Sequence, residues 1–219
     1  MLQKIREHFL KKRLNKFFNA FPNMDGKSIL DLGGYDGWYM DFIKRACPNL
    51  KITIADHDKN GLDIARKKGY DIVLLDGAKK LPFENNQFDI VFCNSVIEHV
   101  TTPKDEIWNL TSGIEFKKRS FIIQKHFANE IMRISKSYFV QTPNKKFFLE
   151  HHTWLPFIQF IPRKTLVKVL RFTNKFWIKK TAPDWNLLTG VEIQEMFSDA
   201  KILKEKFIFM NKSLIAYRK

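Results

Sequence analysis

The chain has 219 residues, a length that suits one large domain with its own hydrophobic core. Hydrophobic residues make up 44% of it and phenylalanine alone occurs 21 times, which excludes an intrinsically disordered chain. The formal net charge of +15 favours an anionic partner: a lipid surface, a nucleic acid or an acidic substrate.

The first predicted element is an amphipathic helix within residues 1–24. Apolar residues recur mostly three or four positions apart, and residues 1–20 hold six Lys/Arg against Glu7. Such a helix can lie on the domain core or on a membrane. The segment has charges throughout and no long apolar run, so it does not signal secretion. With only two cysteines, Cys47 and Cys93, both in apolar stretches, we expect a cytoplasmic protein.

Residues 25–145 alternate short apolar runs with helical stretches. Buried strands are predicted at Ser28–Leu32, Lys51–Ala55, Ile72–Leu75, Phe88–Cys93 and Tyr138–Gln141. Helices are predicted between the first three of them, at Trp38–Ala46 and Leu62–Lys68. Strands joined by helical crossovers predict a mostly parallel sheet in an α/β fold.

Two stretches do not fit this alternation. Thr101–Lys125 is a long, partly basic connection, and residues 146–189 form an apolar, aromatic and basic insertion that we expect to be helical over His151–Asp184. Both should lie near the carboxyl edge of the sheet, where open α/β folds bind ligands, and should cover the substrate. Residues 190–219 predict a helix and a hairpin that adds an antiparallel strand, completing a single domain of residues 1–219.

A glycine turn, Gly33-Gly34-Tyr35-Asp36-Gly37, follows the first strand and leads into a helix near Trp38. Glycines let the backbone approach a ligand closely, and the start of a helix offers unpaired N–H donors. The turn therefore predicts a nucleotide-type site. It does not fit the dinucleotide fingerprint, because Tyr35 and Trp38 stand where that motif needs its second and third glycines.

Acidic side chains end the second and third strands. Asp56 follows Gly37 by 19 positions, where a carboxylate can accept hydrogen bonds from both ribose hydroxyls. Asp76-Gly77-Ala78 places another acceptor where an adenine amino group would lie. Each feature alone is also compatible with an ordinary turn.

The sequence LPFENNQFDIVFCNSVIEHV, residues 81–100, together with ILDLGG and Asp56, resembles the class I S-adenosylmethionine-dependent methyltransferases. The similarity is greatest to the large type 11-like group that acts on small molecules, quinones, lipids and glycans, and it covers most of residues 25–145. It implies a Rossmann-like fold and S-adenosyl-L-methionine as cofactor.

The resemblance also implies which residues hold this cofactor. It gives Asn94 a backbone contact with the methionine amino group, and Asp56 the ribose. It assigns the adenine to Asp76, Gly77 and Ala78, and the methionine part to Asp31, Gly33, Gly34, Tyr35 and Gly37. The family usually has glycine where Tyr35 stands.

A narrower bacterial subgroup is similar around residues 128–152, where QTPN precedes Glu150 and His152, with His151 replacing a usual proline. Methyl transfer is an in-line displacement, for which alignment alone can save ~7–11 kcal/mol. For the O-methylation that we expect, a base could add ~10²–10⁴ in rate. Residues of the right type are His99, Glu150, His151 and His152, and His152 and His99 are preferred.

A Glu/His cluster can instead bind a metal. Quinone-pathway O-methyltransferases are similar around VIEHV, residues 96–100, but carry a further acidic ligand three residues before the glutamate. Here Ser95 precedes Glu98 at that position, so the sequence predicts no metal.

The acceptor stays open between a small molecule, a lipid-linked molecule and a glycan. Nucleic acid is disfavoured, because Asn94-Ser95-Val96-Ile97 lacks the proline-rich element of base-amino methyltransferases and neither cysteine lies in a nucleophile motif. An RNA methyltransferase and a non-catalytic membrane-surface protein of the same fold are the alternatives. Residues 151–183 hold seven Lys/Arg and no acid, which, with residues 1–20, favours peripheral contact with an anionic membrane at its inner face. A solvated basic face is the other interpretation.

Overall fold

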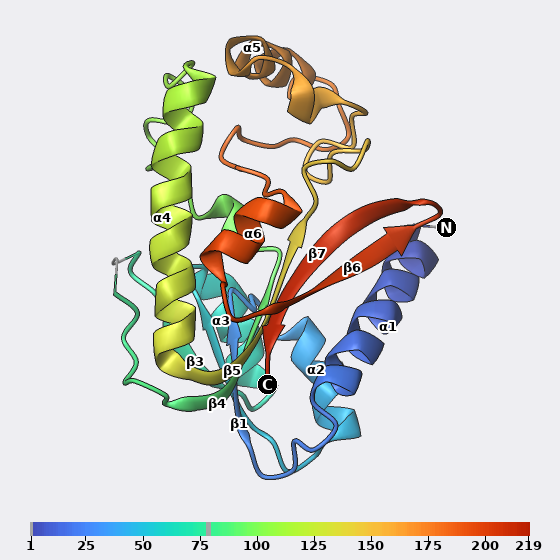
Figure 1. Cartoon of the computed structure of the whole chain (residues 1–219), viewed down its shortest axis with the longest axis vertical. Helices are drawn as coiled ribbons and strands as arrows, with labels where there is room; N and C mark the ends of the chain where they lie inside the picture. The colour runs from blue at the N-terminus through green and yellow to red at the C-terminus, as the bar shows by residue number, and fades with distance from the viewer. Residues whose placement is uncertain (1, 78–79) are drawn as a thin grey trace.

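A seven-stranded sheet forms the centre of the molecule, in a computed structural model that describes residues 2–77 and 80–219 (Figure 1). Its strand order is β3-β2-β1-β4-β5-β7-β6. The strands are β1 (Ser28–Leu32), β2 (Lys51–Asp56), β3 (Asp71–Leu74), β4 (Phe88–Asn94), β5 (Ser135–Pro143), β6 (Lys201–Phe207) and β7 (Met210–Arg218). The first five run parallel, and the β6–β7 hairpin joins β5 in antiparallel pairing. The predicted α/β, Rossmann-like fold with a terminal antiparallel hairpin is confirmed.

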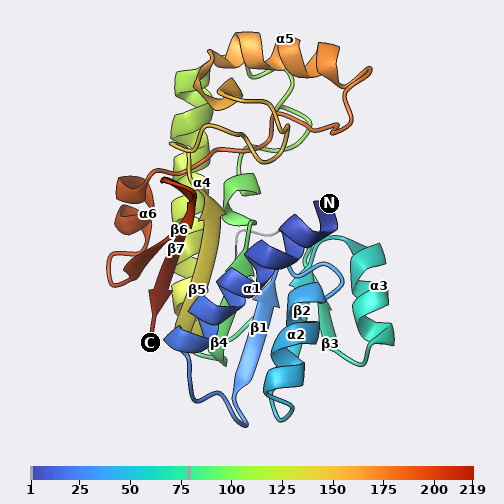
Figure 2. The same ribbon diagram turned by 90° about the vertical axis from the view of Figure 1, so that its right-hand side faces the viewer.

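Helices cover both faces of the sheet (Figure 2). Alternate residues of one strand face opposite layers: Ile29 packs among the helices of one face and Leu30 among those of the other. One layer holds α1 (Leu2–Ala20), α2 (Trp38–Ala46) and α3 (Lys59–Lys67), and the other holds α4 (Gly113–Ile134) and α6 (Gly190–Met196). The molecule is therefore a three-layer sandwich whose sheet is buried on both sides.

The first helix lies on the domain core. Leu10, Leu14 and Phe17 of α1 are buried, and Phe17 packs edge to face on Phe92 and Phe139 of the sheet. The sequence left open whether the apolar face of this helix packs on the domain core or on a membrane, and in the structure it packs on the core. Within the described residues no helix is long and apolar enough to cross a membrane.

The connection predicted at Thr101–Lys125 is in large part a helix. Ser112 caps α4 by accepting the backbone N–H of Glu115, and the helix continues for 22 residues to Ile134. Only its carboxyl-terminal half buries a dense apolar face, through residues such as Ile131. The segment does connect β4 to β5, but its exposed, basic first half hid the helical periodicity, so the sequence analysis did not predict the helix from residue 113 onward.

Residues 144–189, which we call the cap, lie above the carboxyl ends of the parallel strands (Figure 1). Helical structure within it is confined to the short η2 (Ile158–Phe160) and α5 (Arg163–Thr173), less than expected for His151–Asp184. A separate small core holds it together, formed by Ile158, Leu166, Leu170, Trp185 and Leu187.

Arg163 fastens the cap to the rest of the domain. Its guanidinium is buried and donates to the carbonyl oxygens of Ile107, Leu110 and Pro183. It also lies 3.4 Å from the centre of the Phe116 ring, on α4. Burial lowers the pKa of Arg163 to about 10, so the side chain stays charged at neutral pH. One basic residue of the cap thus serves its attachment and is not available to an external anion.

A buried charge pair joins the first helix to the terminal hairpin. The guanidinium of Arg13, on α1, donates from Nε and Nη2 to the two carboxylate oxygens of Glu205, at 3.0 and 2.6 Å. Its Nη1 donates to Tyr39 Oη on α2 and to Asn94 Oδ1 at the end of β4. Four elements that are distant in the sequence therefore meet at one side chain, beside the carboxyl edge of the sheet.

Candidate functional site

The carboxyl ends of β1 and β4 meet at one cavity. The two strands pair in parallel, with Asp31 opposite Phe92. The cavity has a volume of about 170 Å³ and is lined by Asp31, Gly33, Gly34, Tyr35, Asp36, Trp38, Tyr39 and Asn94. The structure thus brings together five predicted cofactor residues: Asp31, Gly33, Gly34, Tyr35 and Asn94.

The glycines at the cavity cannot carry a side chain. A Cβ atom at Gly33 would lie 2.3 Å from Val96 Cγ2, and one at Gly34 would lie 2.4 Å from the carboxyl carbon of Asp31. Gly37, also predicted, begins α2 with a φ of +74°. Gly33 and Gly34 therefore have to lack side chains because Val96 and Asp31 pack directly on them, and we call this turn at the cavity the glycine cradle.

Asp31 lies under this cradle and is buried. Burial and the nearby charges of Asp56 and Asp36 raise the pKa of its carboxyl group to about 8. At neutral pH the unligated protein therefore holds Asp31 mostly protonated, and a cation next to it would favour loss of this proton.

Asp56, the predicted ribose ligand, braces the turn. Its carboxylate accepts the backbone N–H groups of Tyr35 at 2.8 Å and Asp58 at 2.9 Å, and it does not line the cavity. A carboxylate offers about four acceptor sites, so acceptor capacity is left for hydroxyl groups. Asp76 and Gly77 lie exposed beyond β3, and Ala78 is outside the described residues. The ribose and adenine roles stay predictions.

Tyr35 adopts a left-handed backbone conformation, which favours glycine. Its φ is +51°, which strains a residue with a Cβ by about 1–2 kcal/mol. The ring packs on Gly61 of α3, where a Cβ would lie 2.3 Å from ring carbon Cδ2 of Tyr35. The turn can therefore hold a tyrosine at this position, but the neighbouring helix then needs a glycine at position 61.

A second group of polar residues lies where the cap meets the end of β4. Glu98 and His99 belong to the short helix η1 (Ile97–His99), and His152 comes from the cap. The two histidine rings pack edge to face with centres 4.5 Å apart, and one ligand atom of each of the three residues lies within 4.8 Å of those of the others. We call these three residues the Glu-His-His cluster.

A carboxylate holds Nδ1 of each histidine. His152 Nδ1 lies 2.5 Å from Glu150 Oε1, and His99 Nδ1 lies 3.3 Å from Asp184 Oδ1. Despite burial, hydrogen bonds from His152 and its charge lower the pKa of Glu150 to about 2. Burial opposes the charged form of His99, but the Asp184 carboxylate outweighs it and raises the pKa of His99. Nε2 is left as the chemically available nitrogen of both rings.

The third histidine considered as a base does not join this cluster. The His151 ring packs near Phe147, with ring centres 5.8 Å apart. Burial and the positive charge of Lys212 lower the pKa of His151 to about 3, so this ring is neutral. The structure thus groups the predicted catalytic residues His99, Glu150 and His152 and leaves His151 aside.

Three residues of these sites were missed by sequence reasoning: Arg13, Glu98 as a side chain that faces the histidines, and Asp184. Arg13 looks like one more charge on a basic helix face, so nothing marked it. Glu98 had a local signal, its place next to His99 in VIEHV. Asp184 had one as well, since it is the only acidic residue between Glu150 and Glu192.

Comparison with known proteins agrees with this geometry. Residues 29–111 match the family described as the methyltransferase domain. A tRNA U34 carboxymethyltransferase of Campylobacter curvus is 29% identical over 136 residues, which span 55% of this chain and 45% of that protein. The chain thus covers less than half the length of this curated relative.

Solved structures share the fold at low sequence identity. Magnesium protoporphyrin IX methyltransferase of Synechocystis, solved with bound S-adenosylhomocysteine, has a TM-score of 0.58 and 14% identity, and the match covers 100% of this chain and 88% of that one. An S-adenosylmethionine-dependent methyltransferase of Aquifex aeolicus has a TM-score of 0.50 and 15% identity, with coverages of 95% and 87%. The chain therefore has the fold of the class I S-adenosylmethionine-dependent methyltransferases, and residues 29–111 resemble a methyltransferase domain. The sequence implies S-adenosylmethionine as cofactor, and the Synechocystis enzyme holds the product of that cofactor.

The packing of Tyr35 on Gly61 can be tested by a double-mutant cycle. Gly61→Ala should destabilise the wild-type protein, because the new Cβ collides with the Tyr35 ring. In a Tyr35→Gly background the same change should stabilise α3 by about 0.5–1 kcal/mol, since alanine favours a helix over glycine. Urea unfolding of the four proteins measures both effects. An equal effect of Gly61→Ala in both backgrounds would show that the two residues are not coupled.

The raised pKa of Asp31 predicts proton release on cofactor binding. The cofactor product, S-adenosylhomocysteine, carries a cationic ammonium group, so its binding beside Asp31 at pH 7 should release up to one proton, and none at pH 9.5. Calorimetry in buffers of different ionisation enthalpy counts these protons, and Asp31→Asn should abolish the release.

Without ligand, the folded state retains a proton on Asp31 that the unfolded state loses. Stability should therefore fall by up to about 1.4 kcal/mol per pH unit between about pH 4 and 8, less steeply in Asp31→Asn.

Proposed function

We propose that this protein transfers a methyl group from S-adenosylmethionine to an oxygen atom of a lipid-linked or amphipathic acceptor at an anionic membrane surface. Methyl transfer to a small molecule or a glycan would use the same chemistry. Only the surface features described below favour a lipid-linked or amphipathic acceptor over these two. The observation that carries the proposal is the position of the Glu-His-His cluster. It begins four residues after Asn94, a lining residue of the cofactor cavity, and it is closed by a cap with exposed apolar and basic side chains.

The cofactor supplies an electrophilic methyl carbon, and the chain has to align and activate the acceptor. Asp31, the glycine cradle and Asn94 would hold the methionine end, and Arg13 fixes the Asn94 side chain from behind. Hydroxyl acceptors must lose a proton during transfer, and His99 and His152, each oriented through Nδ1, present Nε2 for that purpose. The cap would exclude water from this reaction.

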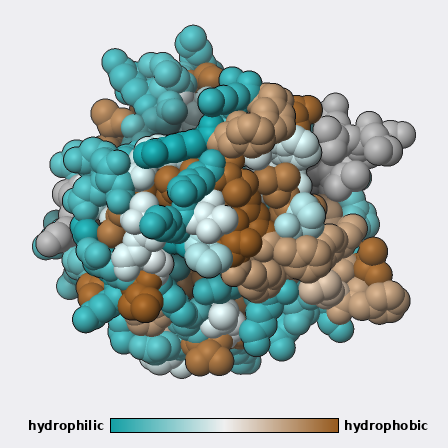
Figure 3. Space-filling view, turned by 90° about the horizontal axis from the view of Figure 1, so that it is seen from above, coloured by the Kyte–Doolittle hydropathy of each residue, from teal (hydrophilic) through white to brown (hydrophobic). Residues whose placement is uncertain are grey.

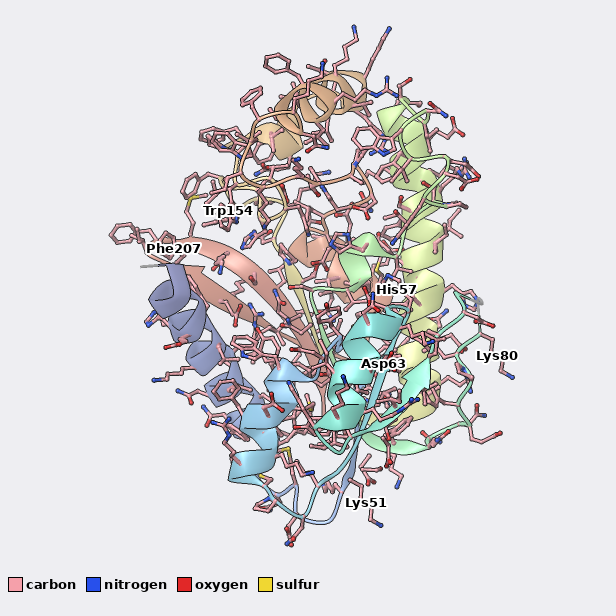
Figure 4. The ribbon with its side chains drawn as sticks, turned by 180° about the vertical axis from the view of Figure 1, so that it is seen from behind. Lys51, His57, Asp63, Lys80, Trp154 and Phe207 are labelled. Atoms are coloured by element: carbon pink, nitrogen blue, oxygen red, sulfur yellow. The ribbon has the colours of Figure 1, made fainter. Side chains whose placement is uncertain are left out.

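Aromatic side chains, both buried and exposed, link the terminal hairpin to the cap. Contacts run from Phe207 to Phe147 with ring centres 6.2 Å apart, from Phe147 to Phe148 at 4.9 Å and from Phe148 to Phe157 at 6.2 Å. The exposed apolar residues at this side are Trp154, Phe157, Phe160, Phe207, Ile208, Phe209 and Met210, which we call the apolar rim. Figure 3 shows apolar side chains gathered on the cap side, and Figure 4 shows Trp154 and Phe207 on one side of the molecule. A rim of this kind suits contact with a bilayer interface.

Basic residues adjoin the apolar rim. A groove of about 540 Å³ between α1 and β6 is lined by Phe9, Lys12, Asn15, Lys16, Asn19, Lys204, Glu205 and Lys206. Phe9 also contacts Phe207 of the rim, with ring centres 5.7 Å apart. On the cap, Lys164, Lys168 and Arg171 of α5 are exposed. Apolar side chains next to lysines complement an anionic lipid surface.

RNA is the second acceptor class, favoured by one observation. The Campylobacter relative acts on tRNA by name, and the lysines of the groove would suit a phosphate backbone equally well. The exposed rim of phenylalanine and isoleucine argues for the lipid, because protein surfaces that bind nucleic acid are polar and positively charged.

Methyl transfer to fractionated cell material tests the proposal. The purified protein, given S-adenosylmethionine with a labelled methyl group and a cell extract, should label the lipid fraction, and mild base treatment should distinguish esters from ethers. His152→Ala should reduce labelling by about 10²–10⁴, whereas Lys51→Gln, at the far end of the molecule, should not (Figure 4). Label in RNA alone would contradict the lipid acceptor and support RNA, the second candidate. The absence of label from every fraction would contradict the proposed methyl transfer.

Binding to vesicles tests the membrane contact. The protein should sediment with anionic vesicles and not with neutral ones, and salt should weaken the binding. Replacing Lys164, Lys168 and Arg171 with glutamine should weaken it about 100-fold, at ~1 kcal/mol for each basic side chain. The matched control removes the same charge from exposed positions at the other end, in Lys27, Lys51 and Lys67. Equal losses in both triple variants would indicate a net-charge effect and contradict a specific surface.

A further inference from the structure

Glu98 is buried with half of its carboxylate unpaired. The side chain is 0% exposed, and Thr142 Oγ1 donates to its Oε2 at 3.0 Å. The other oxygen, Oε1, has no hydrogen-bond partner among the described residues. A buried charge of this kind is costly unless an opposite charge or a donor compensates it.

The group that faces this oxygen is an imidazole nitrogen. His152 Nε2 lies 4.0 Å from Glu98 Oε1, which is too far for a direct hydrogen bond. Nδ1 of His152 lies against Glu150, so Nε2 is the nitrogen directed at Glu98. When Nε2 carries no proton, two electron-rich atoms face each other across this gap. Metal bonds to nitrogen and carboxylate oxygen are each about 2.0–2.2 Å long, so two ligands of a tetrahedral ion lie about 3.4 Å apart, and a side-chain shift of about 0.6 Å would bring both atoms to one ion.

The surroundings of both histidines match those of metal-binding histidines. Such histidines usually direct their other ring nitrogen at a carboxylate, which fixes the tautomer and the orientation of the ring. Here Glu150 holds His152 and Asp184 holds His99, both through Nδ1. The His99 side chain is 36% exposed, so an ion has a path to the site from solvent.

We propose that Glu98, His99 and His152 bind one divalent transition-metal ion, with Zn²⁺ the natural occupant. Two imidazoles and one carboxylate form a set that suits Zn²⁺, Co²⁺ or Fe²⁺ better than Mg²⁺ or Ca²⁺, which prefer oxygen ligands. Three protein ligands leave a coordination position open. The sequence predicted no metal, because Ser95 stands where a local acidic ligand was expected, whereas the structure supplies His152 from the cap.

The metal also assigns a role to the site, and this part rests on the proposed function. An acceptor hydroxyl at the open position would become more acidic and lose its proton to solvent near neutral pH. The histidines would then act as ligands and would not have to accept the proton. The hydroxyl or phenol class of acceptor follows, since an amine gains little from such a site.

Direct binding measurements test the metal site without any methyl acceptor. We expect the full chain, after chelator treatment and dialysis, to bind a single equivalent of Zn²⁺ in calorimetry and to bind Mg²⁺ far more weakly. Co²⁺ should give visible absorption typical of a site with nitrogen ligands. His152→Ala and Glu98→Gln should lower Zn²⁺ affinity by at least about 100-fold, and Glu150→Gln by about 10–100-fold. His126→Ala, an exposed histidine on α4, is the matched control and should bind as wild type.

Thermal unfolding identifies variants that fail to fold. Glu98→Gln removes an uncompensated buried charge, so without metal it should unfold at the same temperature as wild type or higher, yet gain nothing from Zn²⁺. Absence of saturable binding to the wild-type chain, or an unchanged affinity in both Glu98→Gln and His152→Ala, would overturn the inference. Zn²⁺ binding that depends on these residues supports it even where no fraction accepts a methyl group, a result that would contradict only the proposed function.

Discussion

β1 and β4 pair in parallel at the centre of the sheet, although two strands and two helices separate them in the chain. From β1 the sheet grows through β2 and β3 on one side and through β4 and β5 on the other, so the loops that follow β1 and β4 leave in opposite directions. The opening between them holds the glycine cradle, Asp31 and Asn94. The candidate cofactor cavity and the Glu-His-His cluster both depend on this pairing, because the loop after β4 also carries Glu98 and His99.

The local sequence was sufficient to predict the bounds of an element wherever that element is buried and ends in turn residues. The bounds of β1 and α2 agree with prediction, since SILDL holds three aliphatic residues among its five and is followed at once by the glycines. α4 was missed because charged, exposed residues such as those at 117–119 obscure its apolar face. Helical structure in the cap was overestimated, since its apolar residues pack into a small core made largely of loops.

The residues of the candidate site also fall into those that the local sequence could predict and those that it could not. Asp31 and the glycines were predictable, because the strand, the turn and the helix that form the cradle are consecutive in the sequence. Contacts between His99 and Asp184 and between Arg13 and Asn94 join residues 85 and 81 positions apart. No local pattern records such contacts. His152 was predicted as a base from a short resemblance, but the atom it faces, Glu98 Oε1, became visible only when the cap was placed over η1.

Arg13 and Glu205 are 192 positions apart, and this distance has a consequence for the protein during its synthesis. The same guanidinium holds Tyr39 and Asn94, two residues that line the cofactor cavity. Their final arrangement needs β6, which is synthesised after the three other elements that meet at this guanidinium. Until β6 has been made, Arg13 lacks the carboxylate that fixes it, although the glycine turn is already present. A ligand in this cavity would therefore stabilise chains with the hairpin in place more than chains without it.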